Sequence, residues 1–105
     1  MANFNRNKSN KEVKKQNIFD SLMVLESDTT FSVDSVRETE YGVFFNLVLF
    51  DAVVIFGCRV VDGKNGAFIS LPSRKAGDRY YNHVGVKLSD ELTQVILDTV
   101  EGMLS

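Results

Sequence analysis

The sequence has few of the residues that build catalytic, metal and redox centres. Its 105 residues include one cysteine, one histidine, one proline and no tryptophan. A single cysteine cannot form a disulfide within the chain, and Cys58 stands in an apolar run, which predicts a buried, reduced thiol. His83 stands in a strand-like pattern, and no HExxH, GxSxG or CxxC motif organises a metal site or a nucleophile. We therefore predict no enzymatic activity, no metal site and no cofactor.

Long hydrophobic runs are also missing. No apolar run approaches the ~20 residues that a membrane helix needs, and the first ten residues lack the apolar core of a signal peptide. These absences predict a cytoplasmic protein with no membrane partner. The length fits one domain with a modest core.

Charge is segregated along the chain, although the net charge is only −2. Residues 1–17 are basic, residues 18–58 are acidic, residues 59–87 are basic again and the C-terminal segment is acidic. At physiological salt, charges are screened beyond about 8–10 Å, so these blocks decide local binding more than the total does. The pattern predicts a mobile basic arm at residues 1–12, followed by a single domain at residues 13–105.

Residues 13–26 have two interpretations. Ser9 and Glu12 can form a capping box before a helix with Val13, Phe19, Leu22 and Met23 on one face. Residues 22–25 also form a short apolar run that suits a strand. The sequence does not choose between them.

The next segments predict an antiparallel sheet. Residues 31–39 alternate, with Phe31, Val33 and Ser35 expected on one face and Ser32, Asp34 and Val36 on the other. Residues 43–50 and 53–61 are apolar on both faces. In residues 43–50 we expect one face to carry Val43, Phe45, Leu47 and Leu49 and the other Phe44, Val48 and Phe50. In residues 53–61 we expect one face to carry Val54, Phe56, Cys58 and Val60 and the other Val53, Ile55 and Val61.

Both faces of the sheet are apolar at its central strands, so both must be shielded from water, and a single helix can pack on only one of them. We therefore predict a homodimer, and the alternative is that the sheet closes into a small OB-like barrel. The fold class is α+β, with a curved antiparallel sheet of about five strands packed against a C-terminal amphipathic helix.

The second half of the chain supplies the remaining strands and that helix. Residues 62–66 form a Gly-rich hairpin turn, residues 67–73 the returning strand, residues 74–79 a loop and residues 80–88 a last strand. Pro72 should mark a strand end or edge. Ser89 is expected to cap a helix whose buried stripe is Leu92, Val95, Ile96, Thr99, Val100 and Met103, with Leu97 and Leu104 partly outside it.

A basic and aromatic cluster carries the binding hypothesis. Phosphates need cations, and unpaired bases stack on aromatic rings for roughly 1–3 kcal/mol each, so this composition suits a single nucleic-acid strand. The other interpretation is a solvated loop whose tyrosines pack into the core. The predicted contacts are Arg74, Lys75, Arg79, Tyr80 and Tyr81, with Arg59 and Lys64 nearby and Lys14 and Lys15 in the basic block of residues 1–17.

The run from Arg59 to Lys75, RVVDGKNGAFISLPSRK, resembles a motif of the SpoVG family of small bacterial DNA-binding regulators. The resemblance implies an α+β domain that dimerises through its sheet and binds DNA with basic residues after the Pro-Ser pair. By position, these are Arg74 and Lys75, with a weaker match at Lys64. The basic arm, the two tyrosines and the lack of a His-Pro pair depart from the family pattern.

The chain is also similar to small phage single-stranded-DNA-binding proteins, some of which use OB-like barrels. From these observations we predict a homodimeric, largely sequence-independent single-stranded-DNA-binding protein of phage or bacterial replication or recombination, with proteins of those processes as further partners. The alternatives are a SpoVG-type regulator that binds duplex DNA, and a protein-interaction module whose basic blocks only confer solubility.

Overall fold

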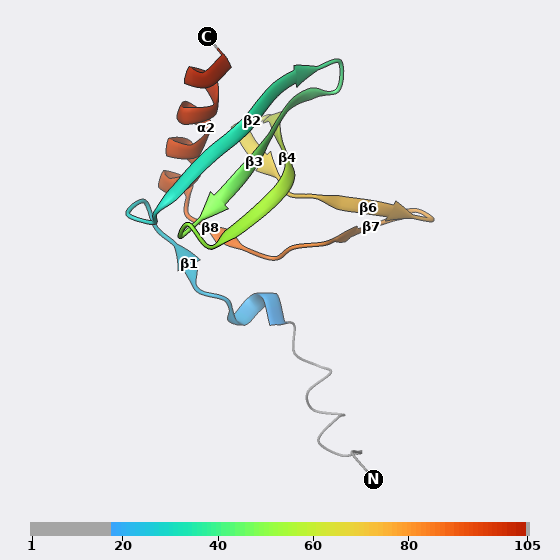
Figure 1. The fold of residues 1–105 in the computed structure, drawn as a ribbon. Coiled ribbons are helices and arrows are strands. Elements are labelled where there is room, and N and C mark those ends of the chain that lie inside the picture. The colour runs from blue at the N-terminus through green and yellow to red at the C-terminus, as the bar shows by residue number, and fades with distance from the viewer. Residues whose placement is uncertain (1–17, 105) are drawn as a thin grey trace.

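A four-stranded sheet with one long helix behind it forms the body of the protein, and a hairpin projects from it (Figure 1). The computed structural model describes residues 18–104. Their elements, in order, are η1 (Ile18–Ser21), β1 (Val24–Leu25), β2 (Phe31–Thr39), β3 (Gly42–Leu49), β4 (Val53–Gly63), β5 (Gly66–Ser70), β6 (Ser73–Ala76), β7 (Arg79–Asn82), β8 (Lys87–Leu88) and α2 (Asp90–Leu104).

The main sheet is antiparallel and open. Its strand order is β2-β3-β4-β5, so β2 and β5 are edges that do not pair with each other. The α+β class and the C-terminal helix are confirmed, whereas the closed barrel is wrong. The expected sheet of about five strands is instead four strands plus two separate pairs, β1 with β8 and β6 with β7. Helix α2 packs on one face of the main sheet, and we call the opposite face the open face.

Two β-bulges change which side chains share a face. In β2 the register shifts between Asp34 and Arg37 at Ser35, whose φ is 56°, and Val36 therefore packs against the core rather than facing away from it. In β4 Gly57, with φ 77°, lies between buried Ile55 and buried Cys58. Because a bulge adds one residue, it reverses the alternation beyond it. The prediction that Phe56 and Cys58 share a face is therefore wrong.

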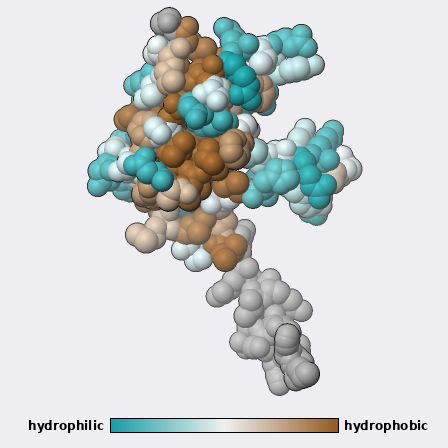
Figure 2. All heavy atoms as spheres, in the orientation of Figure 1, coloured by the Kyte–Doolittle hydropathy of each residue, from teal (hydrophilic) through white to brown (hydrophobic). Residues whose placement is uncertain are grey.

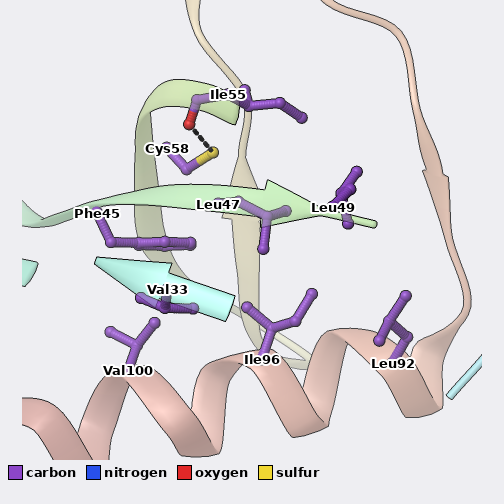
Figure 3. Close-up of a cluster of buried hydrophobic side chains, with 9 residues drawn as sticks. All are labelled: Val33, Phe45, Leu47, Leu49, Ile55, Cys58, Leu92, Ile96 and Val100. Carbon is purple, nitrogen blue, oxygen red and sulfur yellow. Dashed lines mark hydrogen bonds between the residues drawn. The ribbon is translucent and has the colours of Figure 1, made fainter. Parts of the chain in front are cut away.

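The core lies between α2 and the sheet (Figure 3). In β3, Phe45, Leu47 and Leu49 are buried, as the alternating pattern predicted. The Cys58 thiol is also buried and lies 3.7 Å from the Ile55 carbonyl oxygen. Burial raises the pKa of Cys58 from 9.0 to about 11, against a smaller opposing effect of the Leu47 backbone hydrogen bond. The predicted inert thiol is consistent with this environment.

Helix α2 begins where the sequence predicted. The Leu92 backbone N–H donates to the Ser89 hydroxyl at 3.0 Å, which makes Ser89 the N-cap. The buried stripe is rotated relative to the prediction, because the buried residues of the helix are Leu92, Ile96, Leu97 and Val100. Val95 and Met103 are exposed instead. The spacing of apolar residues predicts that one stripe of the helix is buried. Which residues lie at the centre of that stripe depends on how the helix is rotated against the sheet.

The segment before β2 resolves one open alternative. Residues 24–25 form the short strand β1, which pairs in parallel with β8, and a 3-10 turn, η1, precedes it. Lys87 Nζ donates to the Asp20 carbonyl oxygen at 3.1 Å and ties this segment to β8. Leu22 and Met23 are thus outside any helix, while Val13 and the arm at residues 1–12 lie outside the described residues. No helix among residues 18–104 is long and apolar enough to span a membrane.

The turn between β3 and β4 contains strained backbone. Phe50 and Asp51 have φ of 58° and 53°, and the Ala52 N–H donates to the Leu49 carbonyl oxygen at 3.0 Å. Positive φ at both central positions defines a type I′ turn, in which Asn-Gly is favoured. The turn is therefore Phe50–Asp51, and the predicted strand 43–50 ends one residue earlier.

Replacing Asp51 with Gly should stabilise the protein by about 1 kcal/mol, since a left-handed conformation costs most residues roughly 1–2 kcal/mol. Asp51 is exposed, so no buried apolar area is lost, and Phe50 keeps its packing. Thermal unfolding should shift upward by roughly 4–8 °C. The matched control is Glu40→Gly in the β2–β3 turn, where Glu40 does not have a positive φ. An equal gain there would refute the backbone explanation.

Candidate nucleic-acid interface

The predicted binding loop is a β-hairpin. Strand β6 pairs with β7 across a turn at Gly77–Asp78, and every residue of the two strands is exposed. The sequence assigned residues 74–79 to a loop and residues 80–88 to one strand, and both assignments are wrong. Strand β5 ends at Ser70, and Pro72 lies between it and β6, as predicted for a strand end. Figure 1 shows the hairpin pointing away from the sheet.

The hairpin places a cation beside a tyrosine twice. Arg74 lies opposite Tyr81, with the guanidinium carbon 6.0 Å from the ring centroid. Lys75 lies opposite Tyr80, with Nζ 5.9 Å from the ring centroid. Neighbouring residues of a strand point to opposite faces, so each face of the hairpin carries one cation–tyrosine pair. Of the two interpretations of the tyrosines, the structure has them on the surface and not in the core, since Tyr80 is 70% and Tyr81 46% exposed.

Arg79 completes the charge of this element. It lies opposite Ala76, on the same face as Arg74 and Tyr81, because positions two apart along a strand share a face. From residue 73 to residue 82 there are three basic side chains and one acidic side chain, Asp78, which leaves 3 − 1 = +2. The hairpin is therefore a cationic ribbon with exposed rings on both faces.

The other predicted contacts lie elsewhere. Arg59 is on the open face of β4, and its Nη1 donates to the Tyr41 carbonyl oxygen at 3.2 Å. Lys64 is in the β4–β5 turn and lines a groove of about 720 Å³ beside β5 and the first turns of α2. The structure thus unites five of the predicted residues on β6–β7 and separates these two from them. Lys14 and Lys15 lie outside the described residues.

Sequence reasoning named Arg59 but missed Arg37 and the aromatic side chains that share the open face with it. Arg37, Phe44, Arg59 and Ser70 lie in register across β2, β3, β4 and β5. The Arg37 guanidinium carbon is 5.7 Å from the Phe44 ring centroid. No local motif marks this row, because its members are far apart in sequence and only the strand register aligns them. In Figure 2, hydrophobic side chains gather over the middle of the body, whereas the projecting hairpin is hydrophilic.

Within residues 18–104, no three His, Cys, Asp or Glu side chains lie close enough to hold a metal ion. His83 is exposed, and its backbone N–H donates to the Pro72 carbonyl oxygen at 3.1 Å. This contact helps to hold β6 and β7 together at the end where the hairpin leaves the body. The chemistry that this region offers is therefore positive charge, hydrogen-bond donors and exposed rings.

Comparison with known proteins identifies relatives with one shared name. A chain from Macrococcus caseolyticus, named a SpoVG septation protein, is 29% identical over 65 residues, which cover 62% of this chain and 56% of the relative. A namesake from Clostridioides difficile is 36% identical over 47 residues, 45% of this chain and 51% of the relative. A third, from Lachnoclostridium phytofermentans, is 29% identical over 69 residues, 62% of this chain and 74% of the relative.

The chain thus spans about half the length of the first two relatives. No solved structure matches the chain. The sequence model of the SpoVG family matches residues 29–103, from just before β2 to the last turn of α2. That match includes the four-stranded sheet, the projecting hairpin and the helix. The chain therefore belongs to the SpoVG family.

Proposed function

We propose that this protein binds single-stranded DNA, largely independently of sequence, through the β6–β7 hairpin. The observation that carries the proposal is the cation–tyrosine pair on each face of a projecting hairpin. Arg74, Lys75 and Arg79 would neutralise phosphates, and Tyr80 and Tyr81 would stack on unpaired bases. The basic residues Lys14 and Lys15 of the N-terminal segment would add nonspecific attraction.

The isolation of the hairpin also favours a ligand. A two-stranded hairpin is marginally stable in water unless another surface packs on it. Here Tyr80 remains 70% exposed, so most of its apolar surface is free for a base. Contact with a nucleic-acid strand would bury that ring and fix the two strands against each other.

The shape of the hairpin supports a second candidate, a SpoVG-type regulator that binds duplex DNA. The major groove of B-DNA, about 12 Å wide, admits a two-stranded β-ribbon, and β6–β7 is such a ribbon with basic side chains on both faces. The two candidates differ in what the tyrosines do, because a duplex offers no free base faces.

Two properties of the assembly belong to the same proposal. The protein would act in the cytoplasm, beside replication or recombination proteins, and it would form a homodimer. Light scattering across micromolar concentrations measures the homodimer directly, independently of DNA. A monomer mass throughout would contradict the dimer and leave the DNA proposal standing.

The first experiment is a fluorescence-anisotropy titration of the full chain into labelled oligo-dT at several salt concentrations. If the three hairpin cations contact phosphates, they contribute about −2 to the slope of log K against log salt, at about −0.7 per contact for single strands. A duplex of matched length is titrated in parallel. Tighter binding to the duplex selects the regulator, and no binding to either DNA in low salt refutes both and leaves the protein-interaction module.

A further inference from the structure

We propose that the open face of the sheet is a second contact surface for a single nucleic-acid strand and continues the surface of the hairpin. The inference rests on the proposed function and adds a platform where bases stack on phenylalanines between two arginines. It assigns this role to Arg37, Phe44, Phe56, Arg59 and Phe68, which lie on β2, β3, β4 and β5.

Two of the three aromatic rings are accessible on this face. Phe56 is 66% and Phe68 48% exposed, whereas Phe44 is partly buried and lies beneath the Arg37 guanidinium group. Phe56 is turned outward by the Gly57 bulge, which Asn46 Oδ1 stabilises by accepting from the Gly57 N–H at 3.2 Å. Rings that stand on a sheet surface offer flat faces to unpaired bases, and stacking is tolerant of sequence.

The cations of the face form a row that leads toward the hairpin. Strand register places Arg37 opposite Phe44, Phe44 opposite Arg59, and Arg59 opposite Ser70 at the end of β5. After Ser70 the chain passes through Leu71 and Pro72 directly into β6. One nucleic-acid strand can therefore run from this row to the hairpin without crossing the helix side of the sheet.

Charge favours a polyanion over a second copy of the chain as the occupant. The open-face positions of the four strands carry Arg37 and Arg59 against Asp34, which leaves 2 − 1 = +1, and Asp34 already accepts from Asn46 Nδ2 at 3.1 Å. Two such faces packed together would bring four arginines against two aspartates, and like charges at an interface are costly. Phosphates compensate the arginines without that cost. The homodimer of the proposed function would therefore join through another surface, such as the unpaired edges of β2 and β5.

The lack of tryptophan permits a direct test in the full chain. Four variants each introduce one indole: Phe56→Trp and Phe68→Trp on the open face, Tyr80→Trp on the hairpin and Val95→Trp on the exposed side of α2. A base that stacks on an indole quenches its fluorescence. We expect oligo-dT of roughly 16 nucleotides to quench the open-face and hairpin reporters, but not the reporter on α2.

The outcomes separate this inference from the proposed function. The inference is overturned if DNA quenches the hairpin reporter but leaves both open-face reporters as unquenched as Val95→Trp. That result leaves the proposed function of the hairpin intact. No quenching of any reporter, together with no anisotropy change for the unaltered chain, removes both. Quenching at the open face is supported further if Arg37→Gln, a change at an exposed position, lowers the salt slope by about 0.7.

A second copy of the chain on the open face would give a different experimental result. Light scattering could find a dimer that the Phe56→Ser and Phe68→Ser substitutions convert to monomers. If the affinity of each protomer for oligo-dT is then unchanged, the open face is a dimer interface and the inference is wrong. If these substitutions weaken oligo-dT binding at least fivefold and leave the mass unchanged, nucleic acid is the occupant. Melting temperatures of both variants confirm that the fold is retained.

Discussion

Replacing Arg74, Lys75 and Arg79 with alanine is expected to weaken binding to oligo-dT by at least about 100-fold in low salt. A hydrogen bond to a charged group contributes roughly 1.5–3 kcal/mol, and three such groups are removed together. The slope of log K against log salt should become shallower by about 2, since three phosphate contacts are lost. All three side chains are exposed on a hairpin that projects from the body, so the melting temperature should stay the same.

The control is Lys87→Gln, which removes a positive charge from β8 rather than from the hairpin. Because Lys87 also donates to the Asp20 carbonyl oxygen, its melting temperature is measured alongside to show that the fold is kept. It should change the affinity and the salt slope far less than a single hairpin substitution such as Arg79→Gln. Equal losses would mean that net charge, and not the hairpin, governs binding. Such a result would overturn the assignment of the site.

The tyrosines contribute binding free energy that does not depend on the salt concentration. Tyr80→Leu should weaken binding by about 1–3 kcal/mol, which is roughly 5–150-fold, and Tyr80→Phe should keep most of the affinity, because the ring and not the hydroxyl stacks. For the duplex candidate, the two substitutions should act alike. This comparison therefore tests the strand preference within the proposed site.

Replacing Phe45 with alanine is expected to cost about 3–5 kcal/mol of folding free energy, the range for a large aromatic residue in a packed core. Phe45 is fully buried in β3, between α2 and the sheet, in the same cluster as Val33 and Val100 (Figure 3). Since small domains are stable by roughly 5–15 kcal/mol, this one substitution removes a large share. Urea unfolding followed by circular dichroism measures the loss as a lower midpoint.

The neighbouring residue provides the matched control. Phe44→Ala removes the same side chain one position away, on the open face, where the ring is only half buried. Its cost should be clearly smaller than that of Phe45→Ala, because less apolar area returns to water and no closed cavity forms. If Phe44→Ala is the more destabilising of the two, the assignment of the sheet faces is wrong.

Local chemistry was predictable from the sequence. The Ser89 cap, the strand alternation of β3 and a hairpin turn within residues 62–66 each depend on neighbouring residues, and each appears in the structure, where the strands on either side of the turn meet at Gly63 and Gly66. The faces beyond the bulges were not predictable. One inserted residue at Ser35 or Gly57 reverses the alternation, and period-two reasoning has no way to detect it.

The sequence by itself determined an α+β domain with a C-terminal helix, and it identified the basic and aromatic residues from Arg74 to Tyr81. These follow from periodicity and composition, which act over a few residues. Only the tertiary structure decided that those residues form a projecting hairpin with a cation–tyrosine pair on each face. It also decided that the sheet stays open and that Arg37, Phe44 and Arg59 align across it. The physical reason is that strand pairing joins residues distant in sequence, and the register is set by bulges and turns acting together with burial of one face.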